Sequence, residues 1–133
     1  DSRIYRLRGS ELTRCTRDHS LVEGLIEQGT LAREDAADHP QSNVITRAIG
    51  GADTVEFEVG FGDLLPGDRY LLCSDGVHGV ITEAELCSVL VNERNTETAC
   101  RRVVDLVLSR EAPDNLTAVV VDASDADDPR GAR

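Results

Sequence analysis

Two apolar segments that each meet an aspartate turn constrain this fold more than any other feature of the sequence. Residues 69–73 run directly into a turn at Asp75, and a turn at Asp114 runs directly into residues 116–121. If both segments are antiparallel strands of one sheet, the end of the first and the start of the second lie at the same edge. Asp75 and Asp114 would then project into one space. Because two carboxylates held together are costly without a cation, a divalent metal site is the first hypothesis.

Each turn taken alone has a simpler explanation. Asp75 lies between Ser74 and Gly76, and Ser, Asp and Gly are all favoured in turns. Asp114 follows a proline, which is also a common turn or cap position. Asp1, a third carboxylate just before the first predicted strand, carries no weight by itself. The shared placement at strand ends is what favours a metal site over two unrelated turns.

Composition excludes several classes of protein. The 133 residues suffice for one domain, and a formal charge of −11 disfavours nucleic-acid binding, which needs a basic surface. The four cysteines form no Cys-x-x-Cys pair, so we expect no structural zinc and interpret them as small apolar residues in a reducing cytosol. No apolar run reaches membrane-spanning length, and no signal peptide is recognisable. These features predict a cytoplasmic segment without membrane contact.

Hydrophobic periodicity predicts strands and helices that are segregated along the chain. We expect a hairpin over 3–15, strands at 44–48, 55–59, 69–73 and 116–122, and helices near 21–28, 34–37, from 83 to at least 90, and 96–109. Thr82 and Glu85 form a capping box before the third of these helices. Residues 16–48 are expected to be a polar, helical excursion, and 123–133 an acidic disordered tail or linker. The fold class is therefore α+β with a mainly antiparallel sheet.

Four ordered motifs resemble one known family. They are DSRxY at 1–5, TRDHS at 16–20, GDRYLLCSDGV at 67–77 and PDNLT at 113–117. Together they resemble the metal-dependent protein phosphatases (PPM, type 2C) in their bacterial form, over residues 1–122. The resemblance implies part of a β-sandwich of antiparallel sheets flanked by helices, in which residues 16–48 are a flap beside the active site.

The same resemblance implies a cofactor and a reaction. Asp75 and Asp114 would ligate two catalytic Mn²⁺ or Mg²⁺ ions, and Asp1 with Asp75 would contribute to a third ion. Hard oxygen ligands suit these ions. The reaction would be hydrolysis of phosphoserine or phosphothreonine by a metal-activated water, with no side chain of this segment as a catalytic residue. Phosphorylated proteins, including serine/threonine kinases and their targets, would be the partners in signalling.

Two departures from the family pattern limit what this chain could do alone. The Asp-Gly-x-Gly-Gly ligand motif and the upstream phosphate-binding arginine are absent, and both belong to the N-terminal half of such a domain. We therefore expect a C-terminal fragment of an enzyme, itself inactive, whose missing half is a partner. The alternatives are a non-catalytic pseudophosphatase or regulatory binding module, and a structural fragment whose acidic residues only form turns.

Overall fold

The computed structural model describes residues 1–125 and divides the chain into two compact units. The first unit comprises Asp1 and residues 17–60, and the second comprises residues 2–16 and the chain from Phe61 onward. The predicted tail over 123–133 lies largely outside the described residues. Over residues 1–125, no helix is long and apolar enough to cross a membrane.

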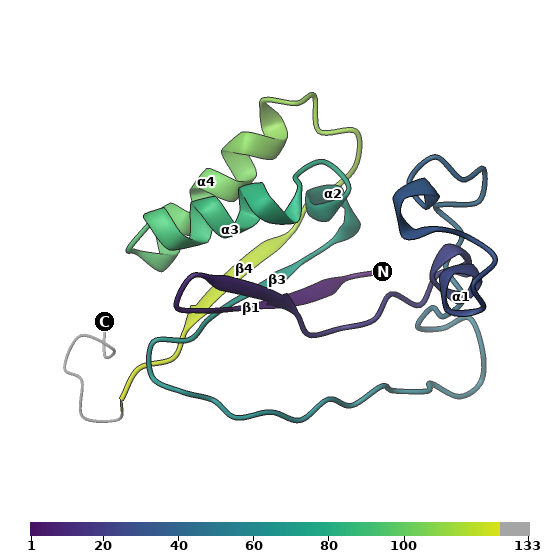
Figure 1. Ribbon diagram of the computed structural model, residues 1–133, viewed down its shortest axis with the longest axis horizontal. Helices are drawn as coiled ribbons and strands as arrows, with labels where there is room; N and C mark the ends of the chain where they lie inside the picture. Colours follow the sequence, from purple (N-terminus) through teal and green to yellow (C-terminus); the bar gives the residue numbers. More distant parts are fainter. Residues whose placement is uncertain (126–133) are drawn as a thin grey trace. The chain divides into compact units, whose positions relative to one another are not determined.

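A four-stranded antiparallel sheet forms the base of the second unit (Figure 1). Its strand order is β2-β1-β3-β4, and the strands are β1 (Arg3–Arg8), β2 (Glu11–Arg14), β3 (Arg69–Cys73) and β4 (Ala118–Asp122). The hairpin between β1 and β2 was predicted and is confirmed by their antiparallel pairing. Gly9 in its turn has a φ of 63°, a conformation that glycine adopts without steric cost.

Three helices cover one face of this sheet (Figure 1). They are α2 (Asp75–His78), α3 (Glu83–Asn92) and α4 (Thr96–Leu108). The predicted capping box begins α3: Thr82 Oγ1 accepts from the backbone N–H of Glu85, and the Glu85 carboxylate accepts from that of Thr82. Asn95 caps α4 by accepting from two amides of its first turn. The sequence did not predict α2, whose four residues are too few for a periodic signal.

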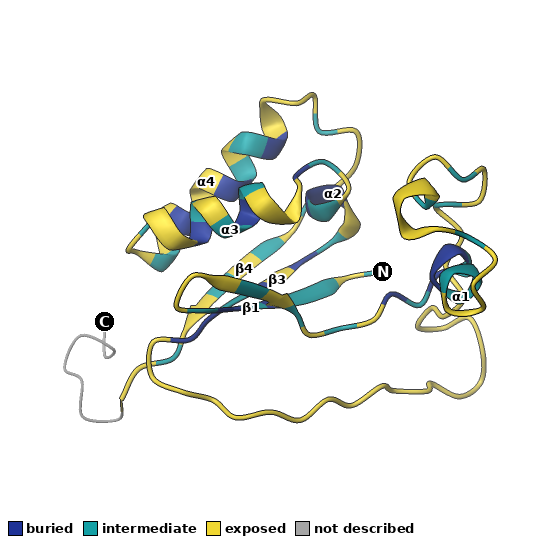
Figure 2. Ribbon diagram, in the orientation of Figure 1, coloured by how far each residue is buried: buried dark blue, intermediate teal, exposed yellow. Residues whose placement is uncertain are grey.

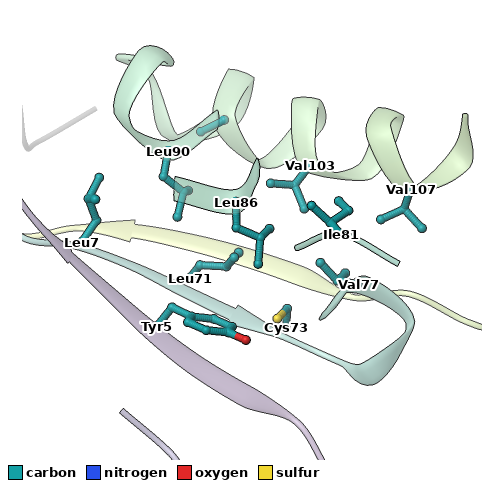
Figure 3. Close-up of a cluster of buried hydrophobic side chains, with 11 residues drawn as sticks. Tyr5, Leu7, Leu71, Cys73, Val77, Ile81, Leu86, Leu90, Val103 and Val107 are labelled. Atoms are coloured by element: carbon teal, nitrogen blue, oxygen red, sulfur yellow. The ribbon is translucent and has the colours of Figure 1, made fainter. Parts of the chain in front are cut away.

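The core lies between the helices and the sheet, as the dark-blue residues of Figure 2 and the close-up in Figure 3 show. Alternate residues of the strands and one stripe of each long helix point into it. Its largest fully buried side chains include Tyr5, Leu71, Leu86, Leu90, Val103 and Val107. The predicted stripe of α4 is therefore confirmed, although Leu106 is only partly buried against the core.

A buried arginine joins the sheet to the end of α3. Arg69 donates to the Asp122 carboxylate of β4 through Nε at 2.6 Å and Nη2 at 2.7 Å. Its guanidinium also donates to the backbone carbonyls of Leu90, Glu93 and Arg94. Since Arg69 is only 8% exposed, these acceptors satisfy a charge that would otherwise be costly to bury.

Within the described part of the second unit, no helix covers the other face of the sheet. Ile4, Leu72 and Val119 form one rung across three strands, and Tyr70 and Val121 belong to the next. Leu72, Val119 and Val121 are among the exposed large hydrophobic residues. The chain thus contains one sheet of the predicted sandwich, with helices on one side.

The first unit is helical and irregular. Helix α1 (Leu21–Glu27) begins at Ser20, whose side chain accepts from the backbone N–H of Glu23. The buried Glu23 carboxylate receives both terminal nitrogens of Arg33, at 3.2 Å and 2.8 Å. Arg33 begins a short 3₁₀-helix, Arg33–Asp35, where an α-helix over 34–37 was predicted.

Both strand predictions in this unit are wrong. Residues 44–48 form only an isolated bridge between Ser20 and Ile45, and residues 55–59 form no strand in the described chain. Alternating apolar residues favour an extended backbone, but a strand also needs a neighbour to accept and donate its hydrogen bonds.

Candidate metal centre

The end of β3 and the start of β4 lie at one edge of the sheet, as the sequence predicts. Cys73 is paired with Ala118 in the β3–β4 register. Beyond this pair, the Ser74 N–H donates to the Thr117 carbonyl at 3.1 Å. The Thr117 N–H donates in return to Ser74 Oγ at 3.0 Å. Ser74 therefore fixes the turn that contains Asp75 to the strand that follows Asp114.

Glycine at position 76 permits the two turns to touch directly. A Cβ atom added to Gly76 would lie 2.2 Å from the carbonyl oxygen of Asn115 and 3.3 Å from the Cα of Leu116. Any other residue would force the turns apart, because real Cβ atoms essentially never approach an oxygen so closely. Since Gly76 follows Asp75 and Asn115 follows Asp114, this backbone contact places both acidic residues at the same edge of the sheet.

Both carboxylates are exposed and held by the backbone next to them. Asp75 is the first residue of α2, and its Oδ1 accepts from the N–H of Gly76 at 2.9 Å. Asp114 Oδ1 accepts from the N–H of Asn115 at 2.7 Å. Solvent can therefore reach both carboxylates, because Asp75 and Asp114 are exposed. Each turn thus presents one oriented carboxylate at the surface of the same edge.

The donor chemistry fits a hard divalent cation, but the ligand set is partial. Asp75 and Asp114 offer oxygen atoms only, which suits Mg²⁺ and Mn²⁺. Within residues 1–125, no three His, Cys, Asp or Glu side chains gather in a way that could hold a metal ion. Asp1 belongs to the first unit, and its role as a ligand stays a prediction.

The loop between α4 and β4 has features that sequence reasoning missed. Glu111 and Ala112 have φ values of 68° and 33°, a region that residues other than glycine rarely occupy. Arg110, just before them, pairs with Glu85 of α3. No sequence signal links these two residues, which are 25 positions apart. The capping box marked Glu85 only as a helix cap.

Comparison with known proteins shows which proteins this chain resembles. No family model matches the chain. It is 39% identical over 127 residues to the serine/threonine protein phosphatase PstP of Mycobacterium tuberculosis, covering 96% of this chain and 24% of PstP. It is 37% identical over 121 residues to a putative 2C-type protein phosphatase of Streptococcus pyogenes, covering 91% of this chain and 49% of that protein.

The solved structures that superpose on this chain are also serine/threonine phosphatases. A crystal structure of M. tuberculosis PstP superposes with a TM-score of 0.87 at 37% identity, covering 93% of this chain and 52% of that one. A Streptococcus agalactiae serine/threonine phosphatase superposes at 0.85 and 38% identity, covering 92% and 51%. A PstP catalytic domain solved with two manganese ions gives 0.82 at 37% identity, covering 94% and 51%.

The chain is therefore similar, in sequence and in fold, to part of the bacterial serine/threonine phosphatases of the PPM and 2C type. It spans about half the length of several of the curated relatives that it matches, and about a quarter of PstP. The α+β fold with an antiparallel sheet and flanking helices is the fold of these phosphatases.

Proposed function

We propose that this chain supplies the C-terminal half of the catalytic centre of a metal-dependent protein serine/threonine phosphatase. The observation that carries the proposal is the contact between Gly76 and the carbonyl of Asn115, which brings Asp75 and Asp114 to one edge. Relatives of the chain are named as such phosphatases, and one solved neighbour holds two manganese ions. Asp75 and Asp114 would ligate two Mn²⁺ or Mg²⁺ ions, and Asp1 with Asp75 a third.

The residues of this chain would position the metal rather than react with the substrate. Bound Mn²⁺ or Mg²⁺ would supply an acidified water and neutralise charge on the phosphoryl group. Ser74 fixes the Asp75 turn to β4 by two hydrogen bonds. Gly76 allows the turns to approach, so that Asp75 and Asp114 are set by backbone contacts rather than by mobile side chains. Rigid positioning of this kind keeps metal ligands in productive geometry.

We infer the remaining roles from the resemblance to these phosphatases. Residues 1–122 would complete a PPM domain with an N-terminal half, and residues 16–48 would be a flap that tunes access of substrates. The substrates would be phosphoserine and phosphothreonine proteins in the cytoplasm, including kinases and their targets. Because the centre requires ligands from both halves, we expect the chain alone not to hydrolyse p-nitrophenyl phosphate with Mn²⁺.

Paramagnetic relaxation tests the metal site directly. Mn²⁺ added to the ¹⁵N-labelled chain should broaden the amide signals of Gly76 and Asn115 before those of other residues, because both amides lie beside the proposed ligands. Asp75→Asn and Asp114→Asn should each weaken this effect. Asp63→Asn, in an exposed loop of the same unit, is the matched control and should leave it unchanged. Broadening spread evenly over the acidic surface would contradict the site.

A non-catalytic protein on the same fold is the second candidate, favoured by the partial ligand set. Joining the chain to an N-terminal PPM half that carries the Asp-Gly-x-Gly-Gly motif separates the two candidates. Mn²⁺-dependent hydrolysis that is lost in Asp75→Asn would support the enzyme. A folded, metal-binding but inactive product would support the binding module.

A further inference from the structure

The loop that presents Asp114 is strained at its start. Residues 110–117, here called the ligand loop, connect α4 to β4. Glu111 and Ala112 both adopt positive φ, at 68° and 33°. Such conformations are costly for residues with a side chain, and they persist only where surrounding contacts hold them. Something in the fold must therefore keep this loop in its observed form.

Arg110 anchors the strained end of the ligand loop to α3. Its Nη1 donates to the Val80 carbonyl at 3.0 Å and to Glu85 Oε2 at 3.2 Å, and its Nη2 donates to Glu85 Oε1. Glu85 is itself fixed, because Oε2 accepts from the N–H of Thr82 at 3.0 Å and from Thr82 Oγ1 at 2.9 Å. The guanidinium is thus bound to the rigid first turn of a helix.

The opposite end of the ligand loop is held by different contacts. Leu116 is partly buried against the core, and Thr117 is hydrogen-bonded to Ser74 in both directions. Ala112 also packs against the core, just after the Arg110 anchor. Residues 113–115 are exposed and lie between these two attachments. Asp114 is the central residue of that exposed stretch.

We propose that Arg110 is a positioning residue for Asp114: its ion pair with Glu85 holds the strained ligand loop so that Asp114 stays at the sheet edge that also carries Asp75. The proposal rests on the proposed function in taking Asp114 as a metal ligand. Without the anchor, Glu111 and Ala112 would relax toward negative φ, and the turn at Asn115 would lose its contact with Gly76. Arg110 itself would touch neither metal nor substrate.

Arg110→Met and a matched control separate positioning from general stability. Arg101→Met removes a similar pair, Arg101 with Glu97 at 2.8 Å, from the exposed side of α4. In the metal-free chain, Arg110→Met should speed amide exchange of Thr117 about fivefold, as expected for loss of one partly exposed ion pair. The Mn²⁺ concentration for half-maximal broadening of Asn115 should rise by a similar factor. Arg101→Met should change neither quantity.

Rescue by glycine tests the role of strain. Glu111→Gly removes the steric cost of positive φ, so the double variant Arg110→Met/Glu111→Gly should regain most of the slow Thr117 exchange and the Mn²⁺ response. Unchanged values in Arg110→Met, equal effects in Arg101→Met, or no rescue by Glu111→Gly would each overturn the proposal. If the unsubstituted chain shows no Mn²⁺ effect at Asn115, the metal assignment fails, and Thr117 exchange still decides whether Arg110 positions the loop.

Discussion

The absence of a Cβ atom at Gly76 controls the geometry of the candidate site. Replacement by alanine would place Cβ 2.2 Å from the Asn115 carbonyl oxygen, so one of the two turns must move. We expect Gly76→Ala to lower the free energy of unfolding by about 2 kcal/mol, which is typical of overpacking, and to abolish Mn²⁺ broadening at Asn115. Urea denaturation and the relaxation experiment measure the two effects.

Gly24 provides the matched control for that substitution. It lies in α1, and an added Cβ would meet no atom within 4 Å apart from its chain neighbours and the backbone of its own helix. Gly24→Ala should therefore leave stability unchanged or raise it slightly, because alanine favours a helix. Equal losses in both variants would show that the close approach at Gly76 has no special importance.

Low pH should weaken the ion pair between Arg110 and Glu85. The pKa of Glu85 is lowered from 4.5 to about 2. The largest cause is the hydrogen bond from the Arg110 guanidinium, followed by the bonds from the Thr82 amide and hydroxyl. Because the pKa is lower in the folded state, the anchor contributes its full stability above about pH 4.5 and loses it as the pH falls toward 2. Arg110→Met should flatten this part of the pH dependence, measured as the urea midpoint between pH 5 and 2. If the urea midpoint of Arg110→Met fell with pH in parallel with that of the unsubstituted chain, the pair between Arg110 and Glu85 would not be the source of this pH dependence.

At the scale of elements, Arg69 joins three of them through one guanidinium. It links β3 to β4 through Asp122 and to the end of α3 through three carbonyls. Arg69→Met should destabilise the fold by about 3 kcal/mol, because it leaves buried acceptors without a donor. Thermal denaturation measures the loss. Arg69→Lys should recover little of it, because one ammonium group cannot reach all four acceptors.

The strands and helices differ in how well their positions could be predicted from the sequence. The bounds of β3 and the buried stripes of α3 and α4 were predictable, because each depends on local periodicity and caps. The strands predicted at 44–48 and 55–59 failed because pairing depends on a neighbour that periodicity does not reveal. For the site, the common edge of the Asp75 and Asp114 turns was predictable from strand direction. The contact of Gly76 with Asn115 and the Arg110–Glu85 pair depend on tertiary packing, which leaves no local signal.

At the scale of the whole molecule, the uncovered sheet face should make the isolated chain associate. Leu72, Val119 and Val121 are 37%, 48% and 48% exposed on adjacent strands. Contiguous apolar surface of this kind favours burial against another surface. We expect concentration-dependent association in sedimentation velocity, and a shift toward monomer in Leu72→Lys. A chain that remains monomeric at high concentration would contradict this expectation.

The contact between Gly76 and Asn115 also bears on how such a site tolerates change over evolutionary time. Because one backbone rests on another, the separation of the two turns at this point is set by main-chain atoms for as long as position 76 carries no side chain. We therefore expect glycine to persist at position 76 in any descendant of this chain that keeps the two turns in contact.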